Sequence, residues 1–248
     1  MTLAIVSAMR EELSALRAAL DGTRAETVAG REFVHGRLAG HEVVLVLSGI
    51  GKVAAAATAA LLIDRLGARA LLFTGVAGGL GAGVRVGDVV VAQELLQHDL
   101  DASPLFPRWE VPLKGRSRFP TGPGLSAALL AACDEVLATP PPGLAALGLH
   151  APRRHTGLVV SGDRFVSSSA ESAALRAALP DALAVEMEGA AMAQVCADFG
   201  CPIAVVRTVS DRADDSAHVD FGRFVAEVAA AYSRDIVLGA LQRGLRAA

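Results

Sequence analysis

Short apolar runs alternate with Ala- and Leu-rich stretches along nearly the whole chain, and this alternation limits the possible folds more than any other feature of the sequence. It predicts strands over residues 3–7, 32–38, 41–47, 70–73, 88–92, 157–161, 184–185 and 203–209. It predicts helices over residues 9–20, 52–65, 125–137, 187–199 and 221–245. Apolar strands between helices are typical of α/β proteins whose helices cover both sheet faces. Ala39-Gly40 predicts a hairpin, and therefore a mixed sheet.

The length of 248 residues, without an internal repeat or a separating linker, predicts a single domain over residues 1–248 with a three-layer α/β/α architecture. Two segments interrupt the alternation. Residues 100–123 contain five prolines and the only tryptophan, Trp109, and residues 139–142 form a rigid proline break. Long irregular segments in compact domains are often functional, and the apolar residues of the first segment predict that it packs against another surface.

Charge and cysteine content exclude several classes of function. A net charge of −3 without blocks of one sign gives no electrostatic support for binding nucleic acid or a membrane surface. The three cysteines have no metal-ligand spacing, and we interpret them as small buried hydrophobic residues in a reducing cytosol. The first residues lack the basic leader of a secretion signal. The longest uncharged stretch, 136–152, is broken by prolines and cannot cross a membrane. We therefore expect a cytoplasmic protein.

Two glycine-rich segments follow predicted strands. Residues 48–54, Ser-Gly-Ile-Gly-Lys-Val-Ala, match the G-x-G-x-x-A pattern of dinucleotide-binding loops. That site also needs an acid about 20 positions later, where this chain has Arg-Ala-Leu-Leu, so we interpret these glycines as serving a tight turn and close helix packing. Residues 74–81 lack a P-loop lysine. They form either a plain turn or one at which Ala77 and Gly78 approach a ligand.

Carboxylates stand at the ends of three predicted strands: Glu11 and Glu12, Glu186 and Glu188, and Asp211. Ligands of α/β sheets collect at this end of the strands, and a buried acid there is costly unless it is paired or used. Three converging carboxylates suggest a general acid, a general base and a hydroxyl-binding group acting on a polar ligand such as a sugar. For the first pair, interaction with the helix dipole is the alternative.

Histidine and serine motifs give little support for other chemistry. His98-Asp99-Leu100-Asp101 has metal-ligand residue types, but hydrogen bonds that anchor a loop are the favoured interpretation. The chain has neither H-E-x-x-H nor the G-x-S-x-G of serine hydrolases. We predict no metal and no cofactor.

Six motifs follow one another along almost the whole chain. They are residues 8–12 (Ala-Met-Arg-Glu-Glu), 48–54, 74–79, 161–165 (Ser-Gly-Asp-Arg-Phe), 185–188 (Val-Glu-Met-Glu) and 207–211 (Arg-Thr-Val-Ser-Asp), with His218 and Phe221 after them. Together they resemble the bacterial 5′-methylthioadenosine/S-adenosylhomocysteine nucleosidases of the nucleoside phosphorylase-like superfamily. The resemblance implies that fold, a purine nucleoside as substrate, and hydrolysis of its N-glycosidic bond to release adenine.

The resemblance also implies catalytic roles. Glu12 is the expected general base, which activates water for attack on the anomeric carbon of ribose. Asp211, oriented by Ser210, is the expected general acid, which protonates N7 of adenine. Bond cleavage builds positive charge on ribose and negative charge on the base, so an acid and nearby carboxylates suit it. Asp211 then needs a pKa that burial raises.

Glu188 is expected to bind the ribose 2′ and 3′ hydroxyls, with Met187 and Arg207 beside the sugar. The other substrate contacts implied by the resemblance are Phe165 stacked on adenine, the backbone of Val166 at its edge, and Met9 and Phe221 around the ribose and the 5′-thio group.

The anion site separates hydrolases from phosphorylases. Related phosphorylases carry a basic side chain just before the Gly-rich segment, where this chain has Leu72-Phe73-Thr74, and Glu12 would repel an anion. We therefore expect water as the nucleophile, while Arg10, Arg31 or Arg37 remains a candidate cation. A phosphate-dependent phosphorylase of the same fold is the alternative.

The chain departs from the family pattern at Val76, where well-known members have serine, and in the loop at 100–109. In the family this loop comes from the partner subunit and covers the 5′ substituent, which implies a homodimer with residues 100–123 near the partner's active site. The choice among methylthioadenosine, S-adenosylhomocysteine, 5′-deoxyadenosine and a futalosine-type nucleoside stays open. A non-catalytic nucleoside-binding protein is a further alternative, but the full set of three acids argues against it.

Overall fold

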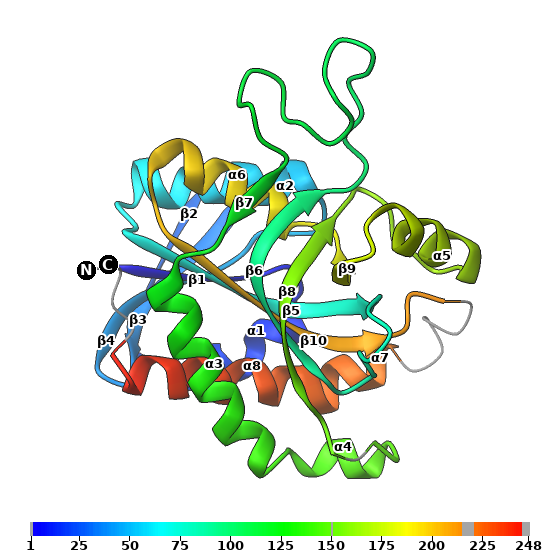
Figure 1. Cartoon of the computed structure of the whole chain (residues 1–248). Helices are drawn as coiled ribbons and strands as arrows, with labels where there is room; N and C mark the ends of the chain where they lie inside the picture. The colour runs from blue at the N-terminus through cyan, green and yellow to red at the C-terminus, as the bar shows by residue number, and fades with distance from the viewer. Residues whose placement is uncertain (1, 150, 215–220, 245–248) are drawn as a thin grey trace.

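The computed structural model describes residues 2–149, 151–214 and 221–244, in which ten strands form one mixed sheet with helices on both sides (Figure 1). The strands are β1 (Leu3–Ser7), β2 (Asp21–Val28), β3 (Arg31–Leu38), β4 (His41–Leu47), β5 (Ala70–Gly79), β6 (Val89–Gln97), β7 (Arg118–Pro120), β8 (Arg154–Ser161), β9 (Ala182–Glu186) and β10 (Ile203–Asp211). The helices are α1 (Arg10–Ala18), α2 (Lys52–Ala60), α3 (Pro123–Ala138), α4 (Pro142–Ala146), α5 (Ser169–Ala178), α6 (Gly189–Phe199), α7 (Phe221–Phe224) and α8 (Ala230–Gln242). The π-helical segments η1 (Leu61–Arg65) and η2 (Val225–Ala229) continue α2 and α7. The predicted fold class is confirmed.

The order of the strands places several strand ends at one point. The sheet runs β10-β6-β8-β9-β5-β1-β4-β3-β2, with β7 on β6, and β10 also pairs with β5. Five strands, β5, β9, β8, β6 and β10, therefore pair in a closed circuit; β1, β4, β3 and β2 extend from β5, and β7 adds to β6. Strands β5 and β9 pair antiparallel only at their C-terminal ends, through Gly78–Val185 and Gly79–Ala184. The C-terminal ends of β5, β9 and β10 consequently meet.

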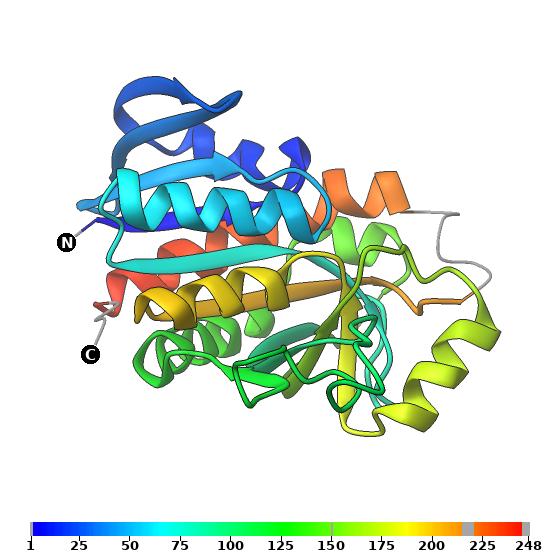
Figure 2. The ribbon, with the colours of Figure 1, turned by 90° about the horizontal axis from the view of Figure 1, so that it is seen from above.

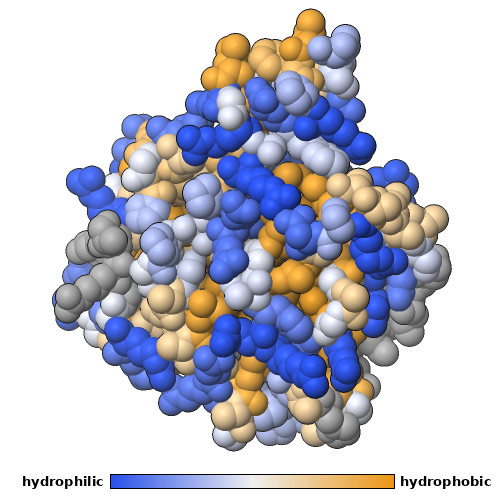
Figure 3. Space-filling view, viewed as in Figure 1, coloured by the Kyte–Doolittle hydropathy of each residue, from blue (hydrophilic) through white to orange (hydrophobic). Residues whose placement is uncertain are grey.

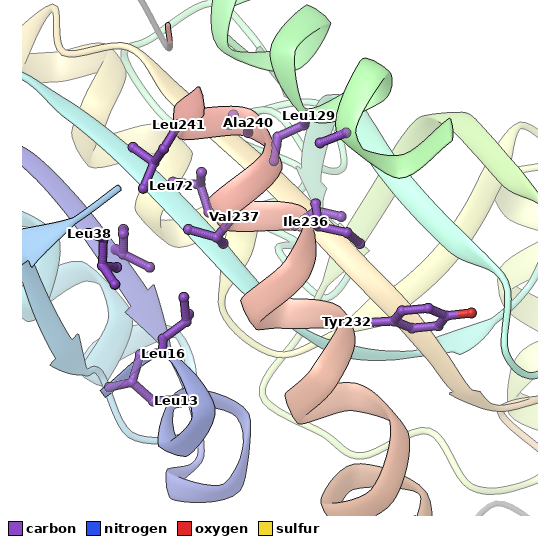
Figure 4. Packing of buried hydrophobic residues seen from close by; sticks show 14 of the residues in the cluster. Leu13, Leu16, Leu38, Leu72, Leu129, Tyr232, Ile236, Val237, Ala240 and Leu241 are labelled. Atoms are coloured by element: carbon purple, nitrogen blue, oxygen red, sulfur yellow. The ribbon is translucent and has the colours of Figure 1, made fainter. Parts of the chain in front are cut away.

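Two helical layers cover the sheet (Figures 1 and 2). Helices α1, α3 and α8 contribute to one apolar cluster, in which Leu16 of α1 and Val237 of α8 lie with Leu72 of β5 (Figure 4). Helices α2 and α6 contribute to the cluster on the other face, where Ala59 and Met192 are buried. The burial of these apolar faces holds the strands in place, and with them the strand ends. No helix in the described ranges is long and apolar enough to cross a membrane.

Strand β5 corrects one expectation. The segment predicted as a turn after residue 73 is instead extended backbone as far as Gly79. Its residues pair with β10 up to Gly78, which lies opposite Asp211. Because neighbouring strands supply hydrogen bonds to this backbone, the glycines continue the strand and do not reverse the chain.

Four elements, β2, β7, α4 and α5, have no counterpart in the sequence prediction. Strand β2 is a polar and mostly exposed edge strand, so it lacks the apolar signal of a buried one. Helix α5 starts after Ser168, whose hydroxyl accepts the Glu171 N–H at 3.3 Å. The last helix was predicted to reach residue 245, but α8 ends at Gln242. Residue 245 and His218 lie outside the described residues.

Candidate active site

A cavity of about 380 Å³ lies where the strand ends meet. Its size falls in the range of about 300–1,000 Å³ that is typical of small-molecule sites. The residues that line it are Ala8, Met9, Glu12, Ile50, Val76, Ala77, Gly78, Arg164, Phe165, Val166, Val185, Glu186, Met187, Glu188, Ser210, Asp211 and Phe221. Segments that are far apart in the chain thus bring the three predicted acids together.

Glu12 stands in the first turn of α1, directly after β1, and its carboxylate is almost completely buried. Oε2 accepts the N–H groups of Met9 at 2.9 Å and Ala8 at 3.1 Å, and Oε1 accepts the Val76 N–H at 3.0 Å. Burial raises the pKa of Glu12 above its ordinary value, although these N–H groups and the charge of Arg207 act against it. The carboxylate is therefore fixed in position and suited to accept a proton.

Two glycines of β5 allow the carboxylates to approach the strand. A Cβ on Gly75 would lie 2.8 Å from Oε1 of Glu12, and a Cβ on Gly78 would lie 3.0 Å from Oδ1 of Asp211. The first distance is shorter than real Cβ contacts show. The second is at the tight limit, and a Cβ on Gly78 would also lie 2.9 Å from the Cβ of Ala213, so both glycines allow close approach at the site.

Asp211 is the last residue of β10 and is also buried. Ser210 Oγ donates to its Oδ2 at 2.8 Å, and the Ala213 N–H donates to its Oδ1 at 2.7 Å. Burial raises the pKa of Asp211, and nearby Asp214 raises it further, while the two hydrogen bonds lower it. The net increase extends the protonated form toward neutral pH, as a general acid needs.

Glu188 faces the cavity immediately before α6. Its Oε1 accepts the Gly51 N–H at 2.8 Å. Burial, together with the charges of Glu186 and Glu12, raises the pKa of Glu188 to about 7, against the opposing effects of Arg207 and the Gly51 N–H.

Arg207 is buried next to the acids of the cavity, and its charge acts on both Glu12 and Glu188. It is 1% exposed and is not among the residues that line the cavity. Its Nη2 donates to Oε2 of Glu186 at 2.6 Å, and its guanidinium lies over the Phe73 ring, 3.9 Å from the centroid. Glu186 also accepts the Ser161 hydroxyl and, at 2.9 and 3.0 Å, the Gly189 N–H. These contacts fix the Arg207 guanidinium against Glu186, which itself lines the cavity.

The other predicted substrate contacts all line the cavity: Met9, Ala77, Gly78, Phe165, Val166, Met187, Ser210 and Phe221. The rings of Phe165 and Phe221 meet edge to face, with centroids 6.1 Å apart and an interplanar angle of 78°. An apolar wall thus lies near the polar carboxylates, as a molecule with a flat base and a hydroxylated sugar requires.

Sequence reasoning missed the lining residues Ala8, Ile50, Arg164 and Val185, and assigned no role to Ser161. Each of them belongs to one of the six motifs, so motif membership was the available signal. Val76, which stands in place of serine, contributes its backbone N–H to Glu12.

Comparison with known proteins gives consistent relationships. Residues 2–242 match the family model of the phosphorylase superfamily. The 5′-methylthioadenosine/S-adenosylhomocysteine nucleosidase of Neisseria meningitidis, solved with methylthio-immucillin-A, is 37% identical, with a TM-score of 0.86 over 98% of this chain and 99% of that chain. The corresponding nucleosidase of Colwellia psychrerythraea, solved with adenine, is 34% identical, with a TM-score of 0.87 over 97% and 94%. Futalosine hydrolase of Helicobacter pylori is 30% identical, with a TM-score of 0.84 over 98% of both chains. The chain therefore belongs to the phosphorylase superfamily and, within it, to the 5′-methylthioadenosine/S-adenosylhomocysteine nucleosidase family.

Proposed function

We propose that this protein hydrolyses the N-glycosidic bond of 5′-methylthioadenosine, S-adenosylhomocysteine or a related 5′-modified adenosine, releasing adenine and the 5′-substituted ribose. The observation that carries the proposal is the convergence of Glu12, Glu188 and Asp211, all buried and all with a raised pKa, on one cavity. Binding alone needs neither an acid nor a base, so this set favours an enzyme over a nucleoside-binding protein.

On the base side, Asp211 donates a proton to N7 of adenine as the bond between C1′ and N9 breaks. The electron pair of that bond passes to the base, and the proton neutralises the charge that develops there. The hydrogen bonds from Ser210 and Ala213 support this role because they orient the carboxyl group.

On the sugar side, positive charge develops on the ribose, and Glu188 binds its 2′ and 3′ hydroxyls. Glu12 accepts a proton from water as the water oxygen forms the new bond to C1′. The carboxylates stabilise the positive sugar, and the proton that Asp211 gives up is matched by the one that Glu12 takes.

The apolar lining residues position the substrate. Phe165 stacks on the adenine and the backbone of Val166 contacts its edge, while Ala77 and Gly78 lie along the base. Met9, Met187 and Phe221 surround the ribose and the 5′ substituent. Their shared position in the cavity lining supports these assignments, whereas Arg207 acts indirectly by holding Glu186.

The protein is a cytoplasmic homodimer in this proposal. The loop between β6 and β7 projects from the molecule, and apolar side chains gather on it (Figures 1 and 3). Leu105 and Leu113 of this loop are 84% and 90% exposed. Exposed apolar groups of this kind mark association surfaces, and a partner's cavity is the surface that the family resemblance indicates. The free thiols of Cys133, Cys196 and Cys201 suit a reducing compartment.

The test is incubation of the purified protein with 5′-methylthioadenosine in phosphate-free buffer while adenine release is followed. S-adenosylhomocysteine, 5′-deoxyadenosine and a futalosine-type nucleoside are assayed in parallel. We expect adenine release from at least one adenine nucleoside without phosphate. Release that requires phosphate and yields ribose 1-phosphate products would identify a phosphorylase instead, and no release from any of them would end the proposal.

A further inference from the structure

Lys52, Asp99 and Asp163 form a charged cluster beside the cavity, but none of the three lines it. Lys52 Nζ lies 2.6 Å from Oδ1 of Asp99 and 3.8 Å from Oδ2 of Asp163. Oδ2 of Asp99 accepts the Asp163 N–H at 2.8 Å. The Lys52 side chain is only 16% exposed, so solvent screens this cluster less than an ordinary surface ion pair. The proposed reaction gives these residues no role.

The cluster ties together three segments that are far apart in the chain. Asp99 follows β6, Asp163 follows β8, and Lys52 is the first residue of α2. The Lys52 N–H also donates to Oδ1 of Asp163 at 2.7 Å. The N–H groups of a first helical turn lack helical partners and favour an anion, so this carboxylate anchors the start of α2. Burial raises the pKa of Asp99, but Lys52 and the Asp163 N–H outweigh it and leave the pKa lowered.

Gly51 connects the cluster to the cavity. Its N–H donates to Oε1 of Glu188 at 2.8 Å. Its φ of +98° lies in the region that favours glycine, and a Cβ there would lie 3.2 Å from Oδ1 of Asp163. The amide that holds Glu188 therefore immediately precedes the residue that the cluster anchors.

We propose that Lys52, Asp99 and Asp163 are positioning residues for ribose recognition: their network fixes the Gly51 amide, and this amide holds Glu188 in the orientation that binds the sugar hydroxyls. The inference rests on the proposed function, because it takes Glu188 as the ribose-binding group. It assigns a role to residues 48–54, whose glycines match a dinucleotide fingerprint that lacks its acid. The network acts on the sugar, so recognition of the free base is independent of it.

The experiment compares two ligands by calorimetry. One is adenine, and the other is 5′-methylthiotubercidin, a ribosyl ligand in which carbon replaces N7 and which therefore cannot be protonated there. Lys52→Met removes the ammonium and keeps a side chain of similar length, and Lys52→Arg restores a cation. Arg154→Met is the matched control, because Arg154 Nε forms an ion pair of the same 2.6 Å length with Asp134 at the other end of β8.

We expect Lys52→Met to weaken binding of 5′-methylthiotubercidin by about tenfold or more, as for the loss of a hydrogen bond to a charged group. Adenine affinity should stay within about twofold, Lys52→Arg should recover most of the loss, and Arg154→Met should change neither affinity. An equal loss of affinity for both ligands, or an unchanged affinity for the ribosyl ligand, would contradict the proposed role of the network. If thermal unfolding shows that Lys52→Met does not fold, Asp99→Asn takes its place. Its affinities for 5′-methylthiotubercidin and adenine are then compared in the same way.

The two proposals fail in different ways. A wild-type protein that binds neither ligand and releases no adenine contradicts the proposed function, and the network with it. A wild-type protein that binds both ligands and releases adenine, beside a Lys52→Met variant with unaltered ratios, contradicts the network alone.

Discussion

The three acids of the cavity differ in what surrounds them, although burial disfavours the charged form of each. Glu12 is held by three backbone N–H groups, Asp211 by a hydroxyl and one N–H, and Glu188 by one N–H beside another acid. These surroundings, and not the residue type, distinguish the proposed proton acceptor Glu12 from the proposed proton donor Asp211.

Asp211→Asn tests the proton donor. An amide cannot supply the N7 proton, so we expect kcat to fall by about two to four decades. Steady-state adenine release measures the loss, and calorimetry with adenine checks that the cavity still binds. A kcat within about threefold of the wild type would show that Asp211 is not the acid.

Glu12→Gln tests the proton acceptor. We expect hydrolysis to stop while nucleoside binding stays measurable. Both carboxylate oxygens of Glu12 accept backbone N–H groups, so the NH₂ group of a glutamine side chain would face an N–H donor in place of an acceptor. This mismatch should lower the free energy of unfolding by about 1–3 kcal/mol. Thermal unfolding separates this cost from the catalytic loss, and near wild-type turnover would contradict the assignment.

Glu188→Gln tests the raised pKa through stability. Burial raises the pKa of Glu188 to about 7 in the folded protein, against an ordinary value of 4.5. Protonation therefore favours the folded state: this contribution is fully present below pH 4.5 and is lost as pH rises through 7. The variant lacks the titration, so its melting temperature should exceed that of the wild type at pH 8 and approach it near pH 4.5. A difference that does not depend on pH would contradict the raised pKa.

At the scale of elements, Glu12 of α1 can approach β5 closely because the facing residue of β5, Gly75, has no side chain. We expect Gly75→Ala to lower kcat/KM at least tenfold, because its Cβ would lie 2.8 Å from a carboxylate oxygen that the Val76 N–H holds. Gly83→Ala is the control. A Cβ added at Gly83 would have no atom within 4 Å, and the φ of Gly83 lies outside the region that favours glycine. Equal activity of both variants would show that β5 tolerates a side chain at Gly75.

At the scale of the whole molecule, the projecting loop between β6 and β7 is the part that the proposed dimer uses. We expect the wild type to have about twice the mass of the 25.4 kDa chain by light scattering. Leu105→Asp combined with Leu113→Asp should shift it toward the monomer and lower activity, because charges then replace two exposed apolar groups. A wild type that is monomeric and fully active would exclude the dimer.

Local sequence patterns were sufficient to predict an element where its burial agrees with its apolar periodicity. Strand β1 was predicted at its observed ends, and the hairpin of β3 and β4 was predicted with a one-residue difference at its start, because these segments combine apolar character with clear turns. The exposed edge strand β2 escaped prediction because it carries no apolar pattern. Helix α5 was missed although Ser168 and Glu171 form the Ser-x-x-Glu signal of a helix start.

The sequence by itself determined the α/β class and the acids at the strand ends, because apolar periodicity and residue type are local properties. Only the tertiary structure decided that β5 continues through its glycines, that Arg207 pairs with Glu186, and that Gly51 holds Glu188. Each depends on a partner from a distant part of the chain, and such partners come together only when the sheet is assembled.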